Sequence, residues 1–184
     1  HKMVLRESRK GEKVTTLDGK AHSLPGGDIV IEDGSGKLID LCGIMGGANS
    51  AVDENTRNVL LFVQIYDPVR IRKTSMALAH RTAAAVLFEK GLPVETVLPT
   101  IEEGIGLFQK LTGGTPESTV LDILNAQPIP TSVKLNQNLT DFVNTRLGIT
   151  LSAKEIKEIL HSLNFIVVSQ RQVDVPYYRR LDVT

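Results

Sequence analysis

The residues most able to support chemistry lie between positions 39 and 91. A glycine-rich turn at residues 43–47 closes a predicted strand, and a helix is predicted to begin again at Thr82. Glycine lets the backbone approach a ligand closely, because it has no Cβ atom. The first turn of a helix carries N–H groups without intrahelical acceptors. The turn and the helix start together predict a site built from backbone donors, which needs few catalytic side chains.

Motifs for several other reactions are missing. His1, His22, His80, His161 and Cys42 do not have the spacing of metal ligands, so the sequence predicts no zinc site. Neither the phosphate-binding pattern G-x-x-x-x-G-K-[ST] nor the nucleophile pattern G-x-S-x-G occurs. The single cysteine excludes a disulfide within the chain and is expected to be a small buried residue.

The first half is predicted to contain one hairpin and a further strand that leads into a turn. Residues 29–31 and 38–41 are apolar runs joined by an Asp-Gly turn, and residues 14–17 lead into a second Asp-Gly turn at residue 18. Residues 59–65 are apolar with little alternation, which predicts a strand buried on both faces.

Helices are predicted from their capping residues and apolar spacing. Asp67 followed by proline is a helix-start signal, Thr100 is expected to cap a helix, and Ser152 with Glu155 forms a capping box. Gly148 is a stop signal. The predicted helices cover residues 67–78, 82–90, 100–112, 138–147 and about 152–163.

The composition predicts a globular α+β chain of two small domains. Its 184 residues are 41% hydrophobic and 23% charged, and the composition shifts where prolines gather at residues 116–130. We therefore predict one domain over residues 1–132, including a linker, and a second over residues 133–184.

The charge balance limits the kind of partner. Twenty-one basic residues face 21 acidic ones, which argues against an independent nucleic-acid-binding domain and leaves room for an RNA-binding module of a larger protein. The most basic local set, Arg70, Arg72, Lys73 and Arg81, is either a solvated helix face or a contact with an RNA backbone. With no membrane-spanning run and no signal peptide, we expect a cytoplasmic protein without membrane or DNA partners.

Several segments, in this order, resemble the editing domain of bacterial phenylalanyl-tRNA synthetase beta subunits. The matching segments are Gly43-Ile44-Met45-Gly46-Gly47, Thr56-x-Asn58-Val59-Leu60-Leu61, Tyr66-Asp67-Pro68, Ile71-Arg72-Lys73-Thr74 and Phe88-Glu89-Lys90-Gly91. The second half is similar to the small winged-helix-like domain that follows in that subunit, through Leu163-Asn164-Phe165 and Val175-Pro176-x-Tyr178-Arg179. The resemblance implies a mixed-sheet editing domain with helices on one side, then a small α/β winged-helix-like domain truncated at its C-terminus, both within a longer protein.

The resemblance also implies an activity. The family's editing site hydrolyses tyrosine mischarged onto tRNA(Phe), in an enzyme that pairs the beta subunit with an alpha subunit and uses ATP and magnesium. By this likeness Thr82 and Ala84 occupy the catalytic positions, and Gly46 and Gly47 line the amino-acid pocket. No cofactor is expected in the chain itself.

The chain departs from the family pattern at Phe62, at Asp182 and at residues 82–85, where Thr-Ala-Ala-Ala replaces the family's Thr-Asp-Ala-Ser. Phe62 stands where the family carries a glutamate that accepts a hydrogen bond from the tyrosine hydroxyl, and an apolar wall discriminates poorly against a hydroxyl. His80 is the residue that would compensate, unless it is an ordinary surface-loop residue. Asp182 is a lone candidate ligand where the family holds magnesium, and one carboxylate does not make such a site. Two hypotheses follow: an editing hydrolase impaired by Phe62, or a non-catalytic structural and tRNA-docking module.

Overall fold

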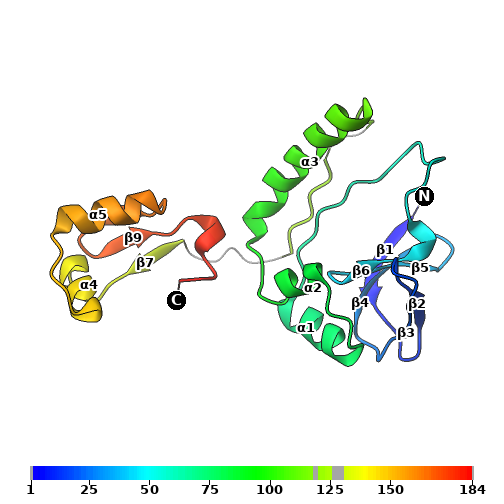
Figure 1. The fold of residues 1–184 in the computed structure, drawn as a ribbon, viewed down its shortest axis with the longest axis horizontal. Helices are drawn as coiled ribbons and strands as arrows, with labels where there is room; N and C mark the ends of the chain where they lie inside the picture. Colours follow the sequence, from blue (N-terminus) through cyan, green and yellow to red (C-terminus); the bar gives the residue numbers. More distant parts are fainter. Residues whose placement is uncertain (1, 118–119, 126–130, 184) are drawn as a thin grey trace. The chain divides into compact units, whose positions relative to one another are not determined.

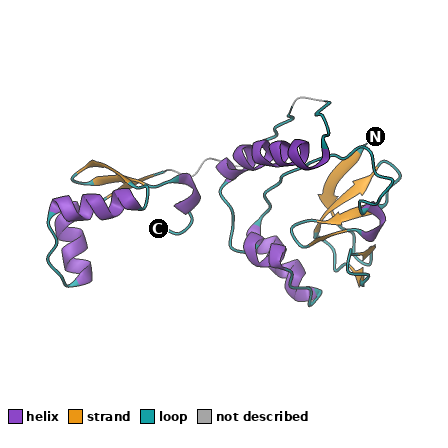
Figure 2. Ribbon diagram, turned by 45° about the horizontal axis from the view of Figure 1, so that its top comes forward, coloured by secondary structure: helices purple, strands orange, loops and turns teal. Residues whose placement is uncertain are grey.

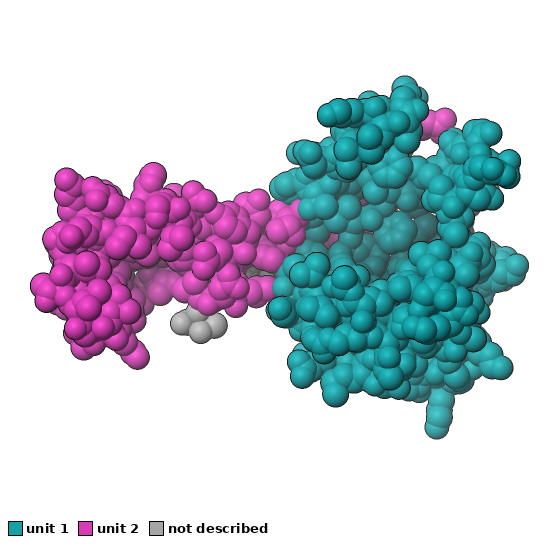
Figure 3. All heavy atoms as spheres, viewed as in Figure 1, with its two compact units in different colours: residues 1–92, 97–115 teal, residues 93–96, 116–184 magenta. Residues whose placement is uncertain are grey.

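The protein folds as two compact units of α+β structure. The computed structural model describes residues 2–117, 120–125 and 131–183. The first unit comprises residues 1–92 and 97–115, and the second comprises residues 93–96 and 116–184 (Figure 3). The boundary predicted near residue 132 stays a prediction, because residues 126–130 beside it lie outside the described part. None of the described helices is long and apolar enough to cross a membrane.

The first unit is built on a four-stranded sheet and a separate hairpin (Figure 1). The sheet has the order β1-β4-β5-β6. The hairpin predicted over residues 29–41 is confirmed, and the predicted turn at residues 18–19 joins β2 to β3 as a second hairpin. All pairs between the described strands are antiparallel, so they do not include the parallel pairing that a mixed sheet requires. The strands are β1 (Met3–Glu7), β2 (Lys13–Thr15), β3 (Ala21–Ser23), β4 (Ile29–Asp33), β5 (Leu38–Leu41) and β6 (Met45–Gly46).

Three helices and a short 3-10 turn accompany these strands (Figure 2). Asp67 begins α1 as predicted, because its carboxylate accepts from the amides of Val69 and Arg70. The expected cap at Thr100 is wrong, since α3 begins earlier and carries Pro99 in its first turn, where a missing N–H costs little. The elements are η1 (Ala48–Ser50), α1 (Pro68–Ala77), α2 (Ala83–Phe88) and α3 (Val97–Thr112).

One hydrophobic core joins the hairpin, the sheet and the first two helices. Burial of these aliphatic side chains removes apolar surface from water, which is the main stabilising contribution to such a unit. The buried members are Val14, Leu24, Val30, Leu41, Ile44, Ile71 and Ala85.

The strand predicted over residues 59–65 is wrong. The segment is extended but is not a strand, and Val59, Leu60 and Phe62 expose 50%, 69% and 43% of their surface. Leu61 does pack toward α3, where its Cδ2 would lie 3.1 Å from a Cβ added at Gly104. An apolar run favours burial, but a strand also needs a neighbouring backbone to pair with, and none of the described strands pairs here.

A buried carboxylate connects α1 to the strands. Asp28 is only 2% exposed and accepts hydrogen bonds from the Ser8 hydroxyl at 2.7 Å, the Thr74 hydroxyl at 2.6 Å and the Gly26 amide at 3.2 Å. The donors come from the end of β1, from α1 and from a glycine turn. These neutral donors compensate the desolvation that burial of a carboxylate otherwise costs.

The second unit packs two helices with a three-stranded antiparallel sheet of order β7-β9-β8. The predicted capping box at Ser152 is confirmed, and Gly148 ends its helix at φ 67°, as a left-handed cap requires. The element order is compatible with a winged-helix-like domain, which stays a prediction. The elements are η2 (Val94–Thr96), β7 (Ser132–Lys134), α4 (Leu139–Leu147), α5 (Ala153–Ser162), β8 (Ile166–Ser169), β9 (Gln172–Asp174) and η3 (Tyr177–Arg179).

The Asp28 contacts give a stability prediction. We expect Asp28→Ala to lower the free energy of unfolding of the first unit by about 2–4 kcal/mol, because two buried hydroxyls lose an ionised acceptor. Asp53→Ala is the matched control, since Asp53 also accepts from a hydroxyl (Thr56, 3.0 Å) and an amide (Asn55, 2.9 Å), but in an exposed loop. Denaturant titrations of both variants measure the difference; equal losses would contradict the argument.

Candidate functional site

The glycine turn is fixed between β5 and the β2–β3 hairpin. The Gly47 amide donates to the Ile39 carbonyl at 2.8 Å, and Thr16 forms an isolated β-bridge with Gly47. A Cβ added at Gly47 would lie 2.9 Å from that carbonyl oxygen and 2.6 Å from the Asn49 Oδ1. Glycine at position 47 is therefore required by close backbone packing, independently of any ligand.

Gly46 faces a different environment. Its carbonyl accepts from the Leu17 amide at 3.0 Å, and a Cβ added there would meet the Leu17 Cδ1 at 3.4 Å and the Asp40 Oδ1 at 3.8 Å. These are ordinary contact distances, so packing requires glycine less strictly at position 46 than at position 47.

Thr82 connects the start of α2 to this turn. Its hydroxyl donates to the Ile44 carbonyl at 2.8 Å and accepts from the Ala85 amide at 3.0 Å. Ile44 lies two residues before Gly46, so the two features predicted from the sequence do lie next to each other. The hydroxyl has one hydrogen, which is already donated, and only one oxygen lone pair remains for a ligand or water.

His80 is buried beside His22 of the β2–β3 hairpin. It is 5% exposed, so the surface-loop interpretation of this residue is wrong. Its ring lies 4.7 Å from that of His22 between centroids, and its Nε2 is 3.9 Å from the Asp18 carboxylate. Within the described residues, neither histidine Nε2 has a hydrogen-bond partner. His22 and Asp18 had no sequence signal as its neighbours, because the fold brings together residues about sixty positions apart.

Phe62 lies in the extended segment before α1. Its side chain is 43% exposed and is not among the residues that pack against the core of the first unit. Two positions on, Gln64 accepts a hydrogen bond from the Tyr66 hydroxyl.

Burial raises the pKa of three groups on or near β5. Burial raises the pKa of the Cys42 thiol, with the Asp40 carboxylate adding to the shift, and burial also raises the pKa of the Asp40 carboxyl itself. Burial likewise raises the pKa of the Tyr66 hydroxyl. A thiol with a raised pKa is a poor nucleophile, so Cys42 is a packing residue, as predicted.

The four basic candidates divide into two pairs. Arg70 forms an ion pair with Glu7, and Arg81 pairs with Glu89 at 2.6 Å. Arg72 and Lys73 are exposed on α1 and form no ion pair with any described residue. Only the second pair has cations free to meet a phosphate group.

The described residues do not support a metal site. Asp182 is engaged with the Arg179 guanidinium at 3.0 Å, and the described part of the chain has no cluster of three or more His, Cys, Asp or Glu residues suited to a metal. Asp182 and its described neighbours therefore do not fit a magnesium site.

Comparison with known proteins relates the chain to a protein family. The B3/4 domain model matches residues 1–113. The chain is 35% identical over 181 residues to the phenylalanine–tRNA ligase beta subunit of Geobacter sulfurreducens, covering 96% of this chain and 22% of the relative. The beta subunits of Streptococcus thermophilus and Carboxydothermus hydrogenoformans are each 34% identical, over 99% and 96% of this chain. The chain spans about a fifth of the length of these relatives, at 22% of each.

The Thr82 contacts lead to a second prediction. Thr82→Val keeps the shape of the side chain but removes both hydrogen bonds, so we expect the free energy of unfolding to fall by about 1–2 kcal/mol. Thr82→Ser retains a capping hydroxyl and is expected to stay within about 0.5 kcal/mol of the parent chain. Urea titration followed by circular dichroism measures both; a Val variant as stable as the parent would show that the cap contributes nothing.

The contact between His22 and His80 predicts how stability depends on pH. Burial, with a further contribution from His80, lowers the pKa of His22 below its ordinary value, so the unfolded chain takes up a proton first as the pH falls. This contribution to stability is complete above the unfolded pKa of about 6.5 and is lost as the pH falls toward the lower folded pKa.

We therefore expect His22→Gln to flatten the decline in stability between about pH 7.5 and pH 5.5. His161→Gln, at an exposed position on α5, should leave the slope unchanged. Denaturant midpoints at several pH values test this, and an unchanged slope in His22→Gln would exclude His22 as the titrating group.

Proposed function

Because the chain belongs to the B3/4 domain family, we propose that it is the tRNA-editing part of a phenylalanine–tRNA ligase beta subunit. Its proposed substrate is tRNA(Phe) mischarged with tyrosine, and its reaction is hydrolysis of the aminoacyl ester. The similarity to three beta subunits over nearly the whole chain supports this assignment.

One structural observation carries the proposal. The Thr82 hydroxyl is hydrogen-bonded to the Ile44 carbonyl, two residues from Gly46, so the helix start and the glycine turn adjoin. An aminoacyl group seated against Gly46 would have its ester near the beginning of α2. The first amides of that helix, at Ala83 and Ala84, have no intrahelical acceptor and are available to a carbonyl oxygen.

The proposed reaction needs only water and hydrogen-bond donors. The water oxygen forms a bond to the ester carbon, and the negative charge that develops on the carbonyl oxygen is stabilised by the donors. The bond from the carbon to the ribose oxygen then breaks, and the proton that the attacking water gives up ends on the ribose oxygen. In this proposal the remaining lone pair of Thr82, which neither of its two hydrogen bonds uses, accepts a hydrogen bond from the attacking water.

A non-catalytic role is the second candidate, and specific observations favour it. The Thr82 hydroxyl already caps α2 and bonds Ile44, and Phe62 offers no acceptor for a tyrosine hydroxyl. In this alternative the same scaffold serves subunit architecture and tRNA docking. Under either proposal the alpha subunit is the partner, ATP and magnesium belong to the whole synthetase, and Arg72 and Lys73 are the proposed contacts with the tRNA backbone.

An ester-hydrolysis assay distinguishes the two candidates. The chain replaces its counterpart in the Geobacter sulfurreducens beta subunit, and release of tyrosine from tyrosyl-tRNA(Phe) is followed with time. For an editing enzyme we expect release well above the uncatalysed rate, reduced by about 10-fold or more in Thr82→Val, which cannot orient the water.

Thr82→Ser is the control for folding and capping, and it should retain most of the rate. Release no faster than in the absence of protein, from a correctly folded chimera that still charges phenylalanine, would reject the editing proposal. That result would support the docking module.

A further inference from the structure

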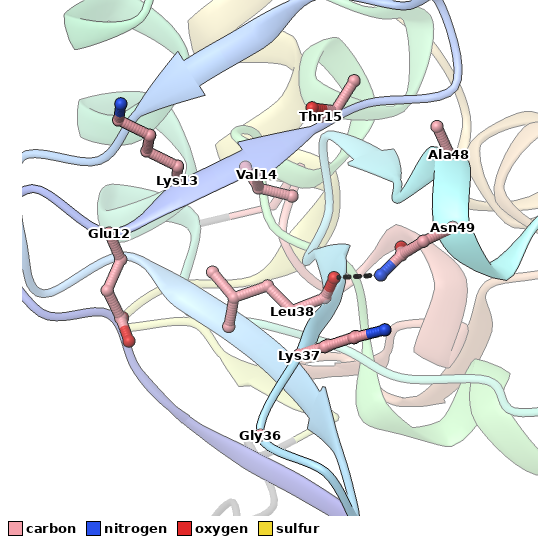
Figure 4. A pocket seen from close by; sticks show the side chains of 9 residues that line it. All are labelled: Glu12, Lys13, Val14, Thr15, Gly36, Lys37, Leu38, Ala48 and Asn49. Carbon is pink, nitrogen blue, oxygen red and sulfur yellow. Dashed lines mark hydrogen bonds between the residues drawn. The ribbon is translucent and has the colours of Figure 1, made fainter.

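A cavity of about 500 Å³ opens beside the glycine turn, within the first unit (Figure 4). This volume lies in the range that accommodates small ligands and single nucleotides. Three elements form it: β2, the turn from β4 into β5, and η1. The lining residues are Glu12, Lys13, Val14, Thr15, Gly36, Lys37, Leu38, Ala48 and Asn49.

The free charges around this cavity are positive. Lys13 and Lys37 are exposed and form no ion pair with any described residue. Glu12, the single acidic lining residue, is occupied: its two oxygens accept from the Arg6 guanidinium at 2.8 Å each, and one also accepts from the Arg9 amide at 2.6 Å. The Arg6 hydrogen bonds hold the pKa of Glu12 low, at about 2, so this carboxylate remains committed to Arg6 at neutral pH.

The rest of the cavity wall combines polar donors with a small apolar floor. The Asn49 side-chain amide donates to the Leu38 carbonyl at 3.1 Å, and its second N–H is not used in that bond. Leu38 contributes aliphatic surface, whereas the Val14 side chain is buried in the core of the first unit. Lys37 extends toward the side where Asn49 lies (Figure 4). Cations, an amide and a hydroxyl around an aliphatic floor suit a phosphate–sugar unit better than an apolar ligand.

Several residues that line the cavity are sequence neighbours of the candidate site. Thr15 precedes Thr16, whose bridge holds Gly47, and Ala48 and Asn49 follow Gly47 directly. We propose that this cavity binds the phosphate–ribose backbone of a single-stranded RNA end, with Lys13 and Lys37 as its phosphate contacts. The identification of the strand as RNA rests on the proposed function, whereas the anion site rests on the cavity and its charges.

Binding of a short RNA by the 184-residue chain tests the proposal. The probe is the tetranucleotide 5′-ACCA-3′, followed by amide chemical shifts in NMR and by the salt dependence of the affinity. We expect shifts at Gly36, Ala48 and Asn49, and about a 10-fold loss of affinity in the double variant Lys13→Gln, Lys37→Gln. The slope of log affinity against log salt should fall by about 1.4, since each lost phosphate contact on a single strand contributes about 0.7.

The matched control removes two lysines of the same unit that do not line the cavity. Lys90→Gln with Lys110→Gln makes the same change in net charge and should leave affinity and shifts within about 2-fold of the parent. Equal losses in the two double variants would overturn the proposal, as would no binding at all. An oligoglutamate peptide or inorganic phosphate that produces the same shifts with equal affinity would also overturn it, because the site would then not select an RNA strand.

Measuring tyrosine release distinguishes a failure of the RNA site from a failure of the editing function. If tyrosine release occurs and is unaffected by the Lys13 and Lys37 substitutions, the cavity proposal fails while the editing function stands. If the RNA shifts disappear in that double variant although the parent releases no tyrosine, the RNA site stands and the editing function fails.

Discussion

The buried carboxylate of Asp28 is the contact on which the first unit depends most. Hydrogen bonds from Ser8, Thr74 and Gly26 converge on one side chain, and they join the end of β1, α1 and a glycine turn at a single buried point. Apolar packing tolerates small displacements of a helix over a sheet, whereas an ionised buried group must keep its donors. Asp28 therefore fixes where α1 lies, and α1 determines where the chain can turn back toward α2 and Thr82.

The candidate site that results is made mainly of backbone and neutral groups. The Cys42 thiol, the Tyr66 hydroxyl and the Asp40 carboxyl are all held toward their neutral forms by burial. The cations without an ion pair among the described residues include Arg72 and Lys73 on α1 and the two lysines beside the cavity. This arrangement suits the proposed attack of water on an ester, in which backbone amides stabilise the charge that develops on the carbonyl oxygen.

Local signals in the sequence predicted local structure well. Local patterns predicted the caps at Asp67 and Ser152, the stop at Gly148 and the hairpin over residues 29–41, because each depends on neighbours within a few positions. The strand prediction for residues 59–65 was wrong for the opposite reason. A strand needs a partner to pair with, and the apolar pattern of a segment does not specify that partner. The site divides in the same way. Residue types indicated Gly46, Gly47 and Thr82, but neither the Thr82–Ile44 bond nor the approach of His22 to His80 could be predicted from local patterns.

The roles of Gly47 and Thr82 affect how related sequences should be compared. The fold alone requires glycine at position 47, where any Cβ would collide with the Ile39 carbonyl. A hydroxyl at position 82 stabilises the fold, because it caps α2. A lineage that lost ester hydrolysis would continue to select both residues, because replacing them costs stability. Retention of these two residues in a related sequence therefore indicates that the fold is intact, and not that the site is active. Drift at Phe62, Lys13 and Lys37, which the core does not constrain, would be the more informative record of what the site still binds.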